Sequence, residues 1–103
     1  YKNAKYRVVI CHVPPAPQKD AWHGDKEIKN KFVPILNDAN VDVMLCAHYH
    51  RFAYHPNLEG VNFPVIVNSN NSYITGEANS GKLSIEVVDT KGKSLLKKDY
   101  TGR

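Results

Sequence analysis

Residues 6–14 read YRVVICHVP and residues 41–51 read VDVMLCAHYHR, and these two stretches decide the fold. Each is a continuous apolar run, typical of a strand that is covered on both faces, and each leads into a histidine. Between them, residues 25–39 carry apolar side chains at helical spacing, namely Ile28, Phe32, Ile35, Leu36 and Ala39. The order strand, helix, strand predicts a βαβ unit in which the two strands run parallel.

The remaining segments predict two helical pieces and further strands. Pro34 interrupts the helical pattern, so we expect a short helix to about Val33 and a second one with Pro34 at its first position. Residues 63–67 predict a strand, and the Asn/Ser-rich residues 68–72 predict a turn. The alternative is that residues 68–71 rim the functional site. Residues 83–100 alternate and turn as an antiparallel hairpin does. The predicted class is α/β, a parallel βαβ unit followed by antiparallel strands and a hairpin.

Composition narrows the classes of function. The chain has 103 residues, 42% of them hydrophobic, which suits one domain. No apolar run approaches the roughly 18 residues of a membrane span. The net charge is +4, and the main basic group consists of Lys91, Lys93, Lys97 and Lys98. No aromatic residues interleave this group, so we expect it to form a solvated edge strand, and we expect no nucleic-acid partner. Cys11 and Cys46 fit no zinc-finger spacing and are expected as buried free thiols.

Three histidines follow the two predicted parallel strands. His12 follows the first strand, and His48 and His50 follow the second. Parallel strands end at the same edge of a sheet, where open α/β sheets bind their ligands, so these side chains should be neighbours. On an extended segment, His48 and His50 would point to one side. Imidazole is a common ligand of Zn, Fe and Mn, and the pattern predicts a metal site more readily than three hydrogen-bonded structural histidines.

The two quoted stretches resemble the last two motifs of the calcineurin-like metallophosphoesterases, most closely those of the purple-acid-phosphatase-like branch. In that family a strand ends in His before prolines, and a second strand ends in GHxH; here Ala47 stands where Gly is usual. The resemblance implies that His12 and His48 ligate one ion and His50 another, in a centre of two divalent or trivalent ions (Fe, Mn or Zn). It implies hydrolysis of a phosphoester substrate by a metal-bridging hydroxide.

The family's DxH, GDxxD and GNH motifs lie upstream of these two, and the sequence contains no match to them. The resemblance therefore implies that residues 1–103 are the C-terminal part of a calcineurin-like phosphoesterase domain, half of a layered β-sandwich. Its first partner would be the upstream half of the same domain, and an exposed sheet edge would also allow a dimer. We assign no catalytic residue within the chain and expect it to be inactive by itself.

His23 and Arg51 are the candidates for substrate binding, as groups that could contact a phosphoryl oxygen. The alternatives are an ordinary surface-loop histidine and an ordinary ion pair. The alternative for the whole chain is a non-catalytic binding or scaffold domain with idle histidines. An amidohydrolase-type barrel is disfavoured because no further βα units follow His50, and a cupin-like site because no Glu lies shortly after it.

Overall fold

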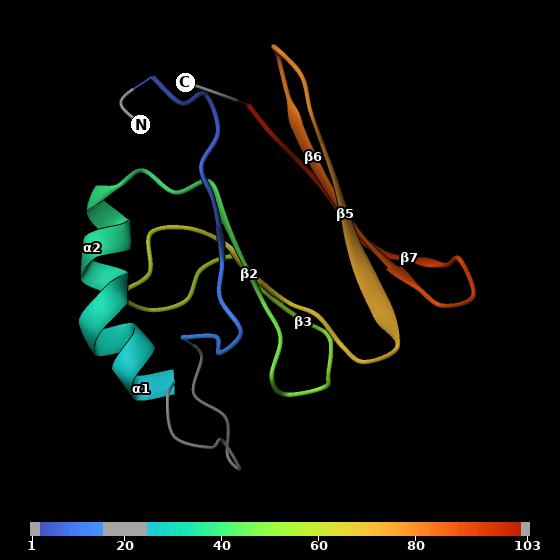
Figure 1. The fold of residues 1–103 in the computed structure, drawn as a ribbon, viewed down its shortest axis with the longest axis horizontal. Coiled ribbons are helices and arrows are strands. Elements are labelled where there is room, and N and C mark those ends of the chain that lie inside the picture. The colour runs from blue at the N-terminus through green and yellow to red at the C-terminus, as the bar shows by residue number, and fades with distance from the viewer. Residues whose placement is uncertain (1–2, 16–24, 102–103) are drawn as a thin grey trace.

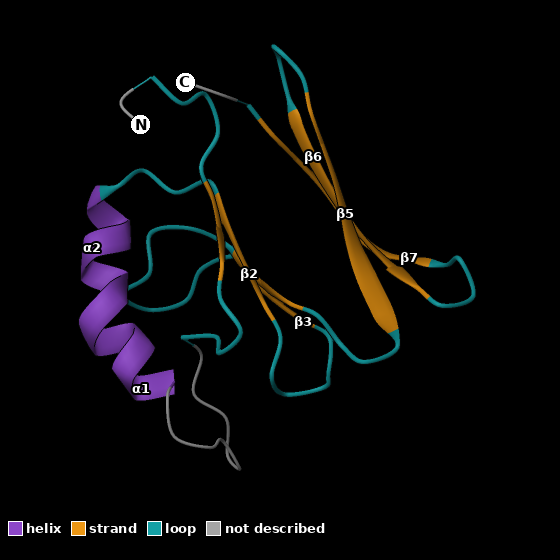
Figure 2. Ribbon diagram, viewed as in Figure 1, coloured by secondary structure: helices purple, strands orange, loops and turns teal. Residues whose placement is uncertain are grey.

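The structure, a computed structural model, describes residues 3–15 and 25–101 of an α/β protein. Within these ranges the chain forms three layers: a helical segment, a mixed four-stranded sheet and an antiparallel three-stranded sheet. The helical segment covers one face of the mixed sheet, and the antiparallel sheet lies against the other face (Figure 1 and Figure 2). The predicted class is confirmed at this level.

The mixed sheet contains the predicted parallel pair. Its strands are β1 (Val8–Ile10), β2 (Val43–Cys46), β3 (Ala53–His55) and β4 (Val65–Val67), in the order β1-β2-β4-β3. β2 pairs parallel with both β1 and β4, which confirms the βαβ unit, and β3 pairs antiparallel with β4. β3 was not predicted, because its residues, Ala-Tyr-His, form no continuous apolar run. The carboxyl ends of β1, β2 and β4 therefore meet at one edge.

The register of β1 on β2 is held at its start by Arg7 and Asp42. The Arg7 backbone N–H donates to the Asp42 carboxylate at 2.7 Å, and the Asp42 N–H donates back to the Arg7 carbonyl at 2.8 Å. The Arg7 guanidinium also donates to the carbonyl of Ala39, at the end of the helical segment, at 3.1 Å. Residues that lie 35 apart in sequence are thus joined by charge-assisted bonds, which are stronger than neutral ones.

The helical segment accommodates Pro34 by widening. It consists of α1 (Asp25–Glu27), a π-helical stretch η1 (Ile28–Phe32) and α2 (Val33–Asp38), with Pro34 in the first turn of α2. The prediction of two pieces that meet near Pro34 is therefore right in outline, although α2 begins one residue earlier. None of the helices in the described ranges is long and apolar enough to cross a membrane.

The widened turn changes which side chains face the sheet. The Val33 N–H donates to the carbonyl of Ile28, five residues back, so the following residues are rotated relative to a regular helix. Val33 is 2% exposed, whereas Phe32 and Ile35 are 53% and 65% exposed. The predicted apolar stripe is wrong for these two residues, because it assumed an unbroken period of 3.6 residues.

The second sheet is an antiparallel meander. It comprises β5 (Ser72–Ala78), β6 (Leu83–Asp89) and β7 (Ser94–Tyr100), in the order β5-β6-β7. The predicted hairpin is confirmed as β6 and β7. β5 was not predicted. Among the described strands β7 is an edge, and it carries Lys97 and Lys98, in agreement with the expected Lys-rich edge strand.

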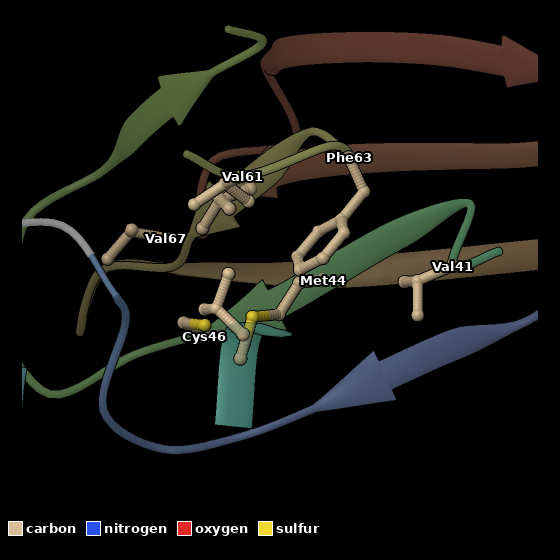
Figure 3. Close-up of a cluster of buried hydrophobic side chains, with 8 residues drawn as sticks. Val41, Met44, Cys46, Val61, Phe63 and Val67 are labelled. Carbon is tan, nitrogen blue, oxygen red and sulfur yellow. The ribbon is translucent and has the colours of Figure 1, made fainter. Parts of the chain in front are cut away.

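Two apolar clusters lie on the two faces of the mixed sheet. In the cluster under the helical segment, the Phe63 ring lies beside Met44, with Cys46 close by (Figure 3). The buried members of the other cluster come from the mixed sheet and the meander: Val43, Ile66, Leu83, Ile85 and Val87. Burial on both faces explains why residues 41–46 read as an almost continuous apolar run.

Replacing Asp42 by Ala should lower the free energy of unfolding by about 1–3 kcal/mol, because a backbone N–H loses its carboxylate acceptor. The matched control is Asp99→Ala, which removes a half-exposed carboxylate that contacts Ser84 and Lys82 and should cost about 1 kcal/mol or less. Urea denaturation of both variants measures the difference. Equal losses would contradict the role given to Asp42.

Candidate metal centre

The pairing of β1 with β2 continues past the ends of both strands. The Cys11 N–H donates to the Leu45 carbonyl at 3.0 Å, and the Ala47 N–H donates to the His12 carbonyl at 2.9 Å. This ladder brings two of the predicted ligands together, with His12 Nε2 at 3.2 Å from His48 Nδ1. The prediction that His12 and His48 lie at one edge of a parallel pair is confirmed.

The two imidazoles meet edge to face. Their centroids are 5.0 Å apart and their planes are inclined by 79°. A hydrogen bond between the rings requires one nitrogen to carry the proton and the other to accept it. Alternatively, two unprotonated nitrogens can turn their lone pairs toward a shared cation. His48 Nε2 is buried and has no hydrogen-bond partner in the part of the chain that the structure describes.

The separation of the facing nitrogens suits a shared ion. With metal–nitrogen bonds of about 2.0–2.1 Å, a nitrogen-to-nitrogen distance of 3.2 Å subtends an angle of about 100–106° at the ion. That angle lies between the octahedral value of about 90° and the tetrahedral value of about 109°. However, residues 3–15 and 25–101 contain no group of three or more His, Cys, Asp or Glu side chains placed to hold an ion. The pair fits half of a coordination shell.

His48 is held in an unusual backbone conformation. Its φ is 74°, and the Tyr49 N–H donates to the Ala47 carbonyl at 2.9 Å across it, the bonding of a γ-turn with positive φ at its centre. His50 also has a positive φ, of 59°. The expectation that His48 and His50 lie on an extended segment, pointing to one side, is therefore wrong. The segment bends at both residues.

The other predicted site residues do not join the pair. His50 is exposed, and its assignment to a second ion stays a prediction. Arg51 is exposed as well, one residue beyond. His23 lies outside the residues that the structure describes.

A cavity of about 450 Å³ opens beside His12, and its lining includes residues of both sheets. It is lined by Ile10, Cys11, His12, Leu45, Cys46, Ala47, Asn68 and Ile74. Asn68 follows β4, the third strand that ends at this edge, and its N–H donates to the Cys46 carbonyl at 2.8 Å. Residues 68–72 were predicted as a turn, with the alternative that residues 68–71 rim the site. The rule that placed His12 and His48, applied to the strand at 63–67, identifies Asn68 as well.

Cys46 lies directly beneath the site. It is 4% exposed, and it and Cys11 are both free thiols, as predicted, although Cys11 is only partly buried. Burial, and secondarily the neighbouring Cys11, raises the pKa of the Cys46 thiol from 9.0 to about 12. Cys46 therefore stays protonated at neutral pH and serves as an apolar packing group, since only the thiolate is a strong ligand.

Comparison with known proteins adds no relative: no protein-family model matches the chain, and no curated protein matches it.

The positive φ of His48 predicts an unequal effect of two small substitutions. His48→Gly should unfold with a free energy at least about 1 kcal/mol higher than His48→Ala, because glycine adopts positive φ without steric cost. Both variants remove the same ring, so their difference isolates the backbone. Thermal or urea unfolding of the two proteins measures it, and a more stable alanine variant would contradict the γ-turn.

The raised pKa of Cys46 predicts a loss of stability in alkali. The unfolded thiol ionises from pH 9.0, whereas the folded thiol keeps its proton up to about pH 12, so the free energy of unfolding should fall across this window. Cys46→Ala should show a shallower fall. Burial, and secondarily Tyr54, likewise raises the pKa of Tyr100 to about 12. Tyr100 therefore adds the same dependence of unfolding free energy on pH to the unsubstituted protein and to Cys46→Ala. Denaturation at several pH values measures the slopes, and identical slopes would exclude Cys46 as the cause.

Proposed function

We propose that this chain supplies the histidine half of a dinuclear metal centre that hydrolyses phosphoesters, like the C-terminal part of a calcineurin-like metallophosphoesterase. The observation that carries the proposal is the 3.2 Å approach of His12 Nε2 to His48 Nδ1 at the carboxyl edge of two parallel strands. The motifs that prompted the resemblance thus coincide with a pair of nitrogens that fits one Fe, Mn or Zn ion.

Three histidines of the chain would bind the ions of such a centre. His12 and His48 would hold one ion through Nε2 and Nδ1, and His50 would ligate the second. The bound ions supply an activated water nucleophile and neutralise charge on the phosphoryl oxygens. The γ-turn at His48 would keep Nδ1 directed at His12, because a residue at positive φ has few alternative conformations.

The remaining ligands would come from a further segment that packs along β1. Among the described strands β1 is an edge, and its Val8 and Ile10 are 40% and 81% exposed. Ile10 lines the 450 Å³ cavity on one side of β1 and a second, apolar cavity of about 240 Å³ on the other, where Phe32 also lies. Exposed apolar side chains on an edge strand with one free side are typical of a surface that is covered in the assembled protein.

The rival function is a binding or scaffold domain with idle histidines. Its support is that the described residues bring only two ligands together and leave His50 exposed. In that case the 3.2 Å contact is an ordinary imidazole hydrogen bond.

The natural gene product that contains residues 1–103 decides between the two functions. We expect it to carry DxH, GDxxD and GNH motifs ahead of Tyr1 and to hydrolyse p-nitrophenyl phosphate in the presence of Mn²⁺ or Zn²⁺. Residues 1–103 alone should be no faster than buffer with metal, because half a coordination shell does not fix a two-metal centre.

Substitutions in the gene product test whether hydrolysis depends on His12 and His48. His12→Ala and His48→Ala should each lower kcat/KM by about a hundredfold or more. His55→Ala, on β3 and outside the histidine pair, is the matched control and should leave kcat/KM unchanged. A gene product without the upstream motifs, or full activity in His12→Ala, would overturn the phosphoesterase proposal and leave the binding domain.

A further inference from the structure

The Asn/Ser turn that follows β4 begins at the same edge of the sheet as the histidine pair. β1, β2 and β4 run parallel, so the residues after them meet at one edge: His12, Ala47 with His48, and Asn68. Asn68 is joined to the end of β2 by the 2.8 Å hydrogen bond from its N–H to the Cys46 carbonyl. It lines the same cavity as His12. The turn is therefore attached to the site by the ladder of the sheet itself.

Hydrogen bonds fix which end of the Asn68 carboxamide is available. The Ser72 hydroxyl donates to Asn68 Oδ1 at 2.6 Å, and the Ser72 oxygen also lies 2.7 Å from the Ser69 hydroxyl. With its oxygen engaged, Asn68 offers the two N–H donors of Nδ2, which bond to no acceptor in the described part of the chain. A carboxamide held in this way suits an anion, because a cation would require the oxygen.

We propose that Asn68 is a substrate-contacting residue, whose Nδ2 donates to an oxygen of the phosphoryl group bound beside His12 and His48. This inference rests on the proposed function for the identity of the anion. Asn68 would contribute orientation of the phosphoryl group and would not ligate an ion. The matching class of ligand is a tetrahedral oxyanion, either inorganic phosphate or the phosphoryl group of an ester.

The sharpest variant is Asn68→Asp, because aspartate keeps an oxygen for the Ser72 hydroxyl and replaces the N–H donors with a negative charge. Asn68→Ala removes the donors without adding charge. Asn70→Ala is the matched control, since Asn70 is an exposed asparagine of the same turn. Thermal unfolding of each variant shows whether the turn still folds.

The experiment titrates inorganic phosphate into the natural gene product by calorimetry, with and without Mn²⁺. The Kd should rise about tenfold in Asn68→Ala, the factor for one lost hydrogen bond to a charged group, and further in Asn68→Asp. Asn70→Ala should match the unsubstituted protein. Phosphate affinity equal in Asn68→Asp and Asn70→Ala, or no phosphate binding to the unsubstituted protein, would overturn the inference.

A separate titration with Co²⁺, monitored by the visible absorption bands of the bound ion, tests the metal centre independently of the anion contact of Asn68. Asn68→Ala should leave the absorption bands of bound Co²⁺ unchanged, whereas His12→Ala should remove them. If His12→Ala binds Co²⁺ as well as the unsubstituted protein, the metal centre fails. A tenfold effect of Asn68 on phosphate binding without metal would then still support the anion contact. Altered Co²⁺ bands in Asn68→Ala would make Asn68 a metal ligand and overturn its assignment as an anion donor.

Discussion

The parallel pairing of β1 with β2 is the interaction on which the rest of the structure depends. It is held at one end by the reciprocal bonds between Arg7 and Asp42, and at the other by the bond from Ala47 to His12. Between these points the register is set, and the two histidines can meet only in that register. A one-residue slip would turn every side chain of β1 to the opposite face. The candidate centre is thus a consequence of strand register and does not depend on a long, independently folded loop.

The sequence predicted the features that depend on buried apolar runs. The runs ending at Cys11 and Cys46 identified the parallel pair, and the topology of a βαβ unit then placed His12 beside His48 without any coordinates. Alternation of apolar residues from Leu83 likewise identified the final hairpin. The run in β2 and the alternation in β6 reflect burial. The expectation that residues 6–11 are covered on both faces is wrong for the described part of the chain, because Val8 and Ile10 are 40% and 81% exposed.

The features that the sequence did not predict arise from local backbone geometry and from packing. Nothing in the residues from Ile28 to Phe32 signals a π-helical stretch, which directly precedes the turn that contains Pro34. The bend at His48 was missed because histidine carries no conformational preference comparable to that of glycine. Asn68 was predicted mainly as part of a turn, and the alternative that residues 68–71 rim the site is supported for Asn68, which lines the cavity beside His12.

The long connection between β1 and β2 has a consequence for the order of folding. β5, β6 and β7 pair with immediate sequence neighbours, whereas Val8 pairs with Val43 across the entire helical crossover. Closure of a long loop costs more conformational entropy than closure of a hairpin, so the meander should form early and β1 should dock late. A three-residue strand that docks last is also the first to detach. Brief local opening of β1 would therefore separate His12 from His48 while the remainder of the domain stays folded.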